Sequence, residues 1–266
     1  MMISIRGILI AIVMASAVAV GVRGEDVSES RPVTSIYSIE IGGARDISTY
    51  ISPLYYEGMS YSLTGSWTKA FQRWSDRCTM RFEGAVNYHR MLNQAETARM
   101  YGLTGEFAWG MSWRKAFARN WEVTIGPMID IYGGALYIPR NGNNPVTALA
   151  SAGLDLSASL KWKTHIGRYK VEVADEMRLP TLSCFFSPEY GESYYEIYLG
   201  NRSGLAHFGW WGNAFGINNL LSMRINFGRT GMQIGYRLDL RTFRANNLET
   251  QLMRNAIVIG IIPHGF

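Results

Sequence analysis

Apolar and polar residues alternate along most of this chain with a period of two. Between Tyr101 and Phe117 the odd positions are mostly aromatic or aliphatic, while the even positions hold Gly, Ala, Ser, Thr or a charged residue. From Met232 to Arg241 the even positions are Met, Ile, Tyr, Leu and Leu, and the odd ones are Gln, Gly, Arg, Asp and Arg. Successive side chains of a β-strand point to opposite faces, so this pattern predicts strands with one apolar and one polar face.

The alternation recurs in ten segments that cover most of the chain. The predicted strands are residues 34–46, 54–69, 77–91, 98–117, 121–138, 147–163, 166–180, 214–227, 230–243 and 252–262. Short connections at 72–76, 118–120, 164–165 and 229 alternate with longer ones near Ser48, Asn93, 141–144, 182–213 and 245–250. Short turns at one end and long loops at the other, with an even strand number, are typical of bacterial membrane barrels. The sequence therefore predicts an all-β, antiparallel, up-and-down transmembrane barrel of about ten strands, with eight to twelve possible.

The first residues follow a different pattern. Residues 8–22 form a nearly unbroken apolar run that ends just before an acidic stretch. A run of this length is shorter than the ~20 residues that a membrane-spanning helix needs, which argues against the alternative of a membrane anchor. We therefore expect a secretory signal peptide at residues 1–24 and a single barrel domain at 25–266. The terminal aromatic Phe266 resembles the assembly signal of outer-membrane proteins.

A soluble exported barrel would alternate in the same way, so the composition of the two faces has to decide. The polar face carries balanced charges among small residues, which suits a crowded lumen, and the apolar face has aromatic residues close to the strand ends, where membrane barrels have their aromatic girdles. The predicted lumen network is Arg81, Glu83, Glu106, Arg114, Glu122, Asp130, Asp155, Lys161, Lys170, Glu172, Glu176, Arg178, Arg224, Arg237, Asp239 and Arg241. Pro127 and Asp175 fall on the lipid-facing parity, so we expect bulges or register shifts there.

Charge and cysteine content exclude some classes of partner. The net charge is +5, but the basic residues are scattered, whereas a nucleic-acid-binding face would cluster them. The two cysteines, Cys78 and Cys184, are predicted at opposite ends of the barrel, and no histidines or cysteines have metal-ligand spacing. We expect no disulfide, no metal and no cofactor.

The predicted size of the barrel bears on conduction. An eight-stranded barrel is just filled by its side chains, and aqueous channels appear at sixteen strands or more, so ten strands with many lumen charges should be plugged or very narrow. Mutual pairing would make those charges tolerable. A selective channel for a small solute is the alternative. It would need a wet path past Arg81, Glu106, Arg178, Arg224 and Arg237.

The connection 182–213 is unusually long and rich in aromatic and acidic residues. Loops of this length are usually functional or disordered. Its candidate binding residues are Glu189, Tyr190, Glu192, Tyr194, Tyr195, Tyr198, His207, Trp210 and Trp211. They could stack on an extracellular ligand or cap the lumen. They could equally pack into the barrel mouth and anchor at the level of the lipid headgroups.

An outer-membrane hydrolase is the second alternative. A protease of this kind needs a histidine and carboxylates that converge on a water molecule; the candidates are His89, His207, Glu189, Glu192 and Asp130. A lipase-like barrel needs a serine next to a histidine, and Ser187 or Ser203 with His207 is the available choice. Neither serine lies in a nucleophile motif, so we expect no enzymatic activity and name no catalytic residue.

Three segments resemble a known family. They are STYISPLYYEG (48–58), RNGNNP (140–145) and FFSPEYGESYYEIYLGNRSG (185–204). They are similar to Bacteroidota outer-membrane barrel proteins that form a domain of unknown function. The resemblance extends over nearly the whole mature chain and implies a barrel in the cell outer membrane, without an activity to transfer. Together with the residues above, it favours a binding or structural role of the outer loops, with outer-membrane lipid and an extracellular ligand or protein as partners.

Overall fold

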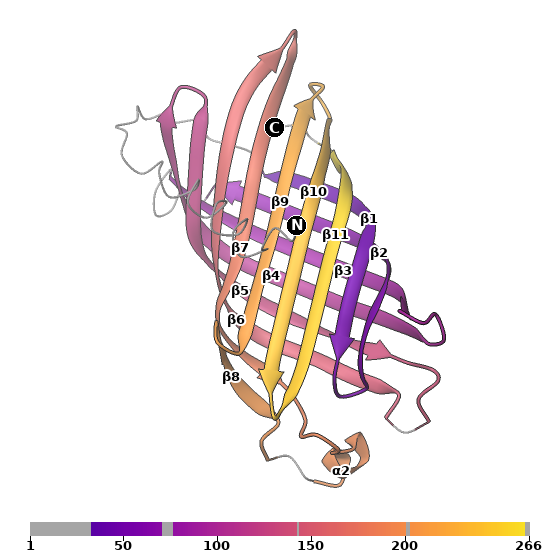
Figure 1. Cartoon of the computed structure of the whole chain (residues 1–266). Coiled ribbons are helices and arrows are strands. Elements are labelled where there is room, and N and C mark those ends of the chain that lie inside the picture. Colours follow the sequence, from indigo (N-terminus) through magenta and orange to yellow (C-terminus); the bar gives the residue numbers. More distant parts are fainter. Residues whose placement is uncertain (1–32, 71–76, 143, 201–202, 264–266) are drawn as a thin grey trace, which may run out of the picture.

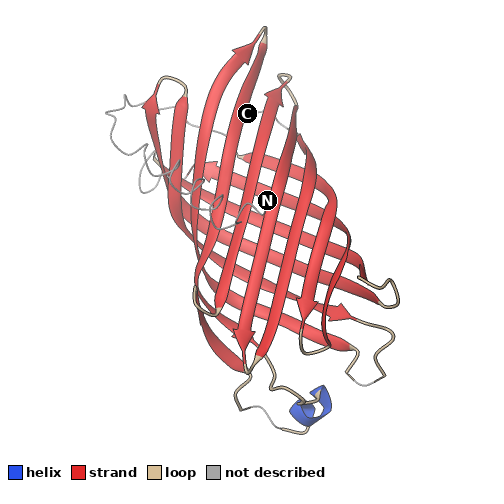
Figure 2. Ribbon diagram, in the orientation of Figure 1, coloured by secondary structure: helices blue, strands red, loops and turns tan. Residues whose placement is uncertain are grey.

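The computed structural model describes residues 33–70, 77–142, 144–200 and 203–263. The predicted signal peptide, the connection at 72–76 and Phe266 lie outside these residues. The described chain consists almost entirely of long strands (Figure 2). They are β1 (Thr34–Ser48), β2 (Ser52–Ala70), β3 (Cys78–Asn93), β4 (Arg99–Ala118), β5 (Trp121–Tyr137), β6 (Val146–Ile166), β7 (Tyr169–Phe186), β8 (Ala206–Trp210), β9 (Ala214–Asn226), β10 (Gly231–Ala245) and β11 (Leu248–Ile262), with one helix, α2 (Tyr194–Tyr198).

The strands form a closed antiparallel barrel (Figure 1). Each pairs with its neighbours in the chain, except that β8 and β9 both pair with β7 and not with each other, and β1 pairs with β11, where Tyr37 faces Ile261. The short β8 pairs with the end of β7, while β9 pairs with the rest of β7, so ten strands make the wall and β8 extends it. We call the end of the barrel that carries α2 the loop end and the opposite end the turn end. The predicted all-β, antiparallel, up-and-down barrel of ten strands is confirmed.

The observed strands match the predicted ones closely, and the largest differences lie at the loop end; at the turn end, the β6–β7 turn lies at 167–168 instead of the predicted 164–165. The predicted long loop 182–213 is wrong, because β7 continues to Phe186 and β8 occupies part of the segment, leaving residues 187–205 as the connection. The β1–β2 and β10–β11 connections are shorter than predicted, whereas the β5–β6 connection, 138–145, is longer than the predicted 141–144. The β10–β11 turn consists of Asn246 and Asn247, whose φ angles of 53° and 60° fit a tight two-residue hairpin turn. Polar residues near this end therefore lie in strands and not in loops. These strands are longer than the ~10 residues with which a transmembrane strand crosses a membrane.

The two positions expected to disturb the register do not do so. Pro127 faces Leu156 in an unshifted β5–β6 ladder. Asp175 keeps its place between Leu160 and Leu221, with its side chain on the outer face as the parity predicted. The expectation of bulges at these sites is wrong, because an isolated proline or carboxylate can be accommodated within an otherwise continuous register. Register shifts occur elsewhere, including one in the β6–β7 pair at Leu154 and Asp155.

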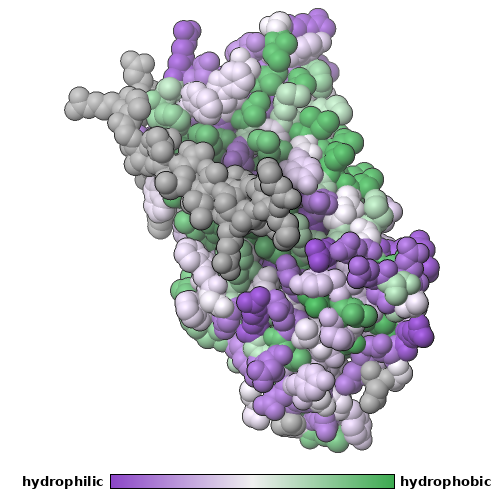
Figure 3. All heavy atoms as spheres, viewed as in Figure 1, coloured by the Kyte–Doolittle hydropathy of each residue, from purple (hydrophilic) through white to green (hydrophobic). Residues whose placement is uncertain are grey.

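The predicted division into two faces holds along the wall. In β10, Met232, Ile234 and Tyr236 are exposed on the outside, while Gln233 between them is buried inside. The outer face is covered by aliphatic and aromatic side chains, and Figure 3 shows hydrophilic residues gathering toward the end with α2. An apolar outer face with a polar inner face is the arrangement of a barrel in lipid. No helix of the described segments is long and apolar enough to cross a membrane.

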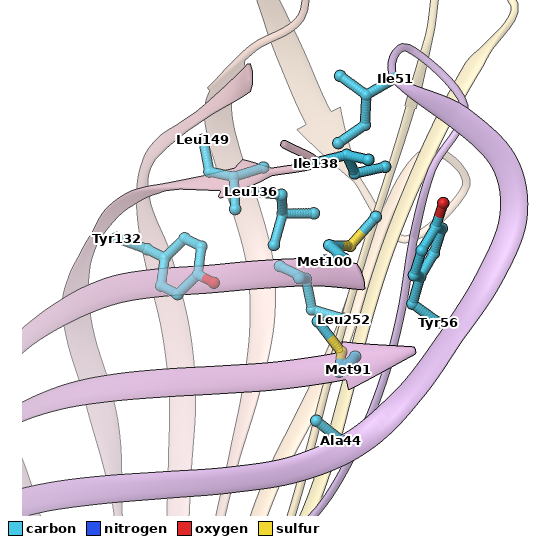
Figure 4. Close-up of a cluster of buried hydrophobic side chains, with 10 residues drawn as sticks. All are labelled: Ala44, Ile51, Tyr56, Met91, Met100, Tyr132, Leu136, Ile138, Leu149 and Leu252. Atoms are coloured by element: carbon cyan, nitrogen blue, oxygen red, sulfur yellow. The ribbon is translucent and has the colours of Figure 1, made fainter. Parts of the chain in front are cut away.

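The lumen has two zones. At the loop end a hydrophobic cluster fills it, made of Ala44, Ile51, Tyr56, Met91, Met100, Tyr132, Leu136, Ile138, Leu149 and Leu252. Figure 4 shows these side chains pointing toward one another from several strands. Met100, Leu136 and Ile138 have no solvent exposure. The rest of the lumen is dominated by charged residues.

Candidate functional site: the lumen and its loop-end cover

Arg178 on β7 is the centre of the charged lumen. Its guanidinium is buried and lies 3.2 Å from Glu83, 3.1 Å from Asp155 and 3.8 Å from Asp130, and it also contacts Glu106. These four carboxylates come from β3, β4, β5 and β6, so one side chain of β7 bridges the interior to the facing wall. Buried charges are tolerated only when they are paired in this way.

Arg241 shares two of these carboxylates. It forms ion pairs of 2.8 Å with both Glu106 and Asp130, and its guanidinium lies 4.3 Å from the centre of the Tyr132 ring. Because Tyr132 belongs to the hydrophobic cluster, this contact marks the boundary between the two zones.

A second group lies toward the turn end. Arg224 pairs with Glu172 at 3.0 Å and with Glu176 at 2.8 Å. Arg81 links this group to the first, because it pairs with both Glu176 and Glu83, at 2.8 and 2.5 Å. The network therefore extends continuously across the barrel instead of forming isolated pairs.

A third group rests on residues outside the predicted set. Glu40 of β1 is completely buried and pairs with Arg237 at 2.9 Å and with Arg254 at 2.8 Å. Arg254 also reaches Asp239 at 3.3 Å. Glu40 lies between Ile39 and Ile41 in the sequence, so the same alternation could have assigned it to the lumen.

The remaining predicted lumen residues lie toward the turn end. Glu122 pairs with Lys163, another unpredicted member, at 2.6 Å, and Lys161 lies 4.0 Å from Glu172. Arg114 is half-buried. Lys170 is exposed at the start of β7 and lies at the rim, so its placement in the buried network is wrong. The parity of Lys170 in β7 points inward, but Lys170 is the second residue of the strand and is therefore exposed to solvent at the rim.

The described residues of the β7–β8 connection, 187–200 and 203–205, lie against the loop end as a cover, and part of the predicted loop set holds the cover there. Tyr50 donates a 2.6 Å hydrogen bond from its hydroxyl to the carbonyl oxygen of Glu192, and the hydroxyl of Tyr194 accepts one of 2.7 Å from the amide of Ala148. The rings of Tyr50 and Tyr194 pack edge to face. His207 Nε2 donates to the carbonyl oxygen of Ser187 at 3.1 Å. Burial, reinforced by Tyr194 and the nearby glutamates, raises the pKa of Tyr50 to about 12.

The other predicted loop residues face elsewhere. Tyr190, Tyr195 and Tyr198 are exposed on the cover around α2, as is Glu189. Trp210 and Trp211 are exposed at and just after the end of β8, on the wall of the barrel. The nine candidates therefore do not form one binding site. They divide into residues that attach the cover, residues that the cover presents, and residues of the wall.

The hydrolase candidates do not assemble as the sequence allowed. His207 meets the backbone of Ser187, and the hydroxyl of Ser187 donates to the carbonyl of Pro188 instead. Ser203 is exposed. His89 does meet a carboxylate, but it is Asp46, at 2.7 Å, and not Asp130. No group of three or more His, Cys, Asp or Glu side chains within the described ranges could hold a metal ion.

The His89–Asp46 pair lies inside the barrel. Ser60 faces His89 across the β2–β3 ladder, and all three residues are buried. Their neighbours Ala44 and Met91 belong to the hydrophobic cluster, which separates the pair from the loop end. Neither Oγ of Ser60 nor Nε2 of His89 makes a hydrogen bond to a described residue, so the serine is not activated as in a Ser-His-Asp triad, and its burial gives it no contact with an external substrate.

Comparison with known protein families assigns the chain to one of them. A family model described as a protein of unknown function, DUF3316, matches residues 7–265. The chain belongs to the DUF3316 family. The expected membership of a domain of unknown function is thereby confirmed. No curated protein matches this DUF3316 chain.

Several solved structures are similar to this DUF3316 barrel. The transport unit of the autotransporter AIDA-I from Escherichia coli aligns with 8% identity over 97% of each chain, with a TM-score of 0.47. The outer membrane protease OmpT from Escherichia coli aligns with 8% identity over 90% of this chain and 100% of that one, with a TM-score of 0.44. Neisserial surface protein A has 9% identity, coverages of 88% and 99%, and a TM-score of 0.34. At such identities no residue role passes from these proteins to the DUF3316 chain.

Proposed function

We propose that this protein is an outer-membrane barrel closed to free diffusion, and that it has a binding or structural role in the envelope through its loop end. One observation carries the proposal: in the described part of the barrel, apolar packing occupies the loop end of the lumen and a network of paired charges extends across the rest, with only small cavities between them. The apolar outer face supports insertion in lipid.

A selective channel is the less favoured alternative. The five residues that would line its path, Arg81, Glu106, Arg178, Arg224 and Arg237, are all in ion pairs. The cavity among them has about 40 Å³ of space for water. That is room for roughly three waters, since one needs about 10–15 Å³. A cavity of this size gives no continuous path, because the hydrophobic cluster lies beyond it.

A hydrolase is supported least. The His89–Asp46 pair is the convergence of histidine and carboxylate that such an enzyme requires, but a substrate would have to displace the hydrophobic cluster to reach it.

The cover is the part of the molecule suited to a partner. Tyr190, Tyr195, Tyr198 and Leu199 are exposed together on a segment whose base is held by Tyr50 and other residues of the barrel mouth. Tyrosine is enriched at protein interfaces because its ring packs while its hydroxyl hydrogen-bonds. An extracellular protein or a ligand with apolar and hydroxyl groups fits this surface.

The deciding experiment combines gel mobility with bilayer conductance. We expect the mature chain from outer-membrane fractions to migrate faster unboiled than boiled, as a closed barrel, and to give no steady conductance in planar bilayers. Steady, ohmic conductance from the heat-modifiable form would overturn the closed-barrel proposal in favour of the channel.

The role of the cover is tested in cells that lack the protein. The triple variant Tyr190→Ser, Tyr195→Ser, Tyr198→Ser should stay heat-modifiable but fail to restore the envelope phenotype of the deletion, such as leakage of a periplasmic enzyme. A matched control replaces Tyr61, Tyr88 and Tyr236 of the outer wall by phenylalanine. Full rescue by the cover variant would remove the proposed role of these tyrosines.

A further inference from the structure

The barrel wall is interrupted near the loop end, where β7 changes partners. Arg178 of β7 faces Asn218 of β9, whereas Leu182 faces Trp210 of β8. The chain thus advances by four residues from Arg178 to Leu182, whereas the facing chain advances by eight from Trp210 to Asn218. The residues between these two pairs form no ladder with each other. Pro180 lies in this gap and has no N–H to donate. On its other side β7 also shifts register against β6 at this level.

The gap is closed by side chains instead of a ladder. The indole Nε1–H of Trp211 donates a hydrogen bond to the carbonyl oxygen of Pro180. The surplus residues form a turn of their own, in which Asn213 accepts from the amide of Trp210 and donates to the carbonyl of Phe208, both at 2.9 Å. Trp211 is exposed on the outside of the wall. A wall closed by side chains opens more easily than a hydrogen-bonded ladder.

A small cavity lies directly behind this gap. It has about 20 Å³ of space for water and is lined by Asp130, Asp155, Pro180, Ala214, Phe215 and Arg241. Phe215 belongs to the outer face and is 36% exposed, whereas Asp130 is 96% buried in the lumen network, with 4% exposed. The cavity therefore extends from the interrupted wall to the centre of the charged network.

The inner side of the cavity holds buried polar atoms without a hydrogen bond to a described residue, namely carboxylate oxygens of Asp130 and Asp155 and also Nε of Arg241. Oδ1 of Asp130 makes no hydrogen bond to any described residue, and Oδ2 of Asp155 lies 3.1 Å from Arg178 Nε without the alignment of one. Arg178 and Arg241 contact four carboxylates, and Arg81 pairs with one of them, Glu83, so that four carboxylates face three guanidiniums. Buried acceptors without a donor are costly, and such groups usually have a ligand, an ion or water to satisfy them.

From these observations we propose that the interruption between β7 and β8–β9 is a lateral port, through which the amine head of a cationic amphiphile in the membrane reaches Asp130 and Asp155. An ammonium group can donate to both carboxylates and balances the excess of negative charge around them. Its alkyl chain stays outside, along Trp211 and Phe215. The proposal rests on the membrane placement proposed above, and it is independent of the closed axial lumen.

Accessibility of a buried alanine tests the port. In a Cys78→Ala, Cys184→Ser background, Ala214→Cys places a thiol in the cavity, and Ala174→Cys places one at another buried, inward position, on β7 where the ladder to β9 is intact. In vesicles, with heat-modifiability checked for each variant, N-ethylmaleimide should label the Ala214→Cys thiol faster by about tenfold or more, a typical effect of easier local opening. Trp211→Phe, which keeps the bulk but loses the indole hydrogen bond, should increase labelling further.

The ligand class is tested with two probes of equal chain length. Dodecylammonium in the vesicles should slow labelling of the Ala214→Cys thiol severalfold, and dodecyl sulfate should not. Asp130→Asn, which is isosteric, should remove this protection. Equal labelling of the two alanine positions in a heat-modifiable barrel overturns the port. Fast labelling without protection by dodecylammonium overturns the amphiphile and leaves water as the occupant. Failure to insert at all would count against the proposed function instead.

Discussion

The two zones of the lumen close the same barrel by different physical means. In the hydrophobic cluster, Met91, Met100 and Leu136 are excluded from solvent by close packing alone. In the charged network, Arg178 holds carboxylates from four other strands. Loss of packing costs free energy in proportion to the volume removed. Loss of one ion from a buried network costs more, because its partners stay buried without compensation. The same lumen should therefore tolerate truncation at the loop end better than charge removal at its centre.

The largest expected effect follows from Arg178→Met, which keeps the bulk of the side chain and removes its charge. Four buried carboxylates lose a shared partner, and we expect a loss of about 3–5 kcal/mol in the free energy of unfolding. Urea unfolding in lipid vesicles, followed by the loss of the fast-migrating gel form, measures this change.

Arg244→Met is the matched control, because Arg244 pairs with Glu249 at 2.8 Å but is largely exposed. It should cost no more than about 1 kcal/mol. Equal effects of the two variants would mean that the central network contributes no more than a surface ion pair, and the contrast between the zones would disappear.

A smaller effect is expected from Leu136→Ala in the hydrophobic cluster. Truncation of a completely buried leucine leaves a cavity and should cost about 2–5 kcal/mol, toward the lower end if Met91 and Met100 relax into the space. Leu63→Ala on the outer wall is the control, because Leu63 is exposed and its removal leaves no internal cavity. The same unfolding assay compares the two. A cost for Leu136→Ala above that for Arg178→Met would reverse the proposed order of the zones.

The sequence predicts most strands of the barrel wall and most members of the ion-pair network, but not which of these residues pair with each other. Alternation predicts that Arg237 points inward, and it carries the same information for Glu40. That these two residues meet depends on closure of β1 onto β11, a contact between the two ends of the chain that no local pattern encodes. The partners of Arg178 likewise depend on which strands face each other across the barrel.

The sequence pattern predicts neither the hydrophobic cluster nor β8, and the reasons differ. Met91 and Met100 lie near strand ends at inward positions, where apolar residues occur on both parities and the alternation fades. The segment 206–210 does alternate, but five residues are too few to be distinguished from the aromatic-rich loop around them. The division of the loop candidates could not be foreseen either, because Tyr50, which anchors the cover, is distant in sequence.

The smallest expected effect concerns the cover above the hydrophobic cluster, where hydrogen bonds replace both apolar packing and charge. Tyr50→Phe removes the donor to the Glu192 carbonyl and should loosen the cover by about 1 kcal/mol. Because the pKa of Tyr50 is raised to about 12, its contribution should be complete below pH 10 and should be lost as the pH rises through 12. Protease cleavage within 187–200 measures the opening. We expect faster cleavage of the variant at neutral pH, and convergence of its rate with that of the wild type near pH 12. Identical rates at neutral pH would show that packing of Tyr50 against Tyr194, and not its hydrogen bond, holds the cover.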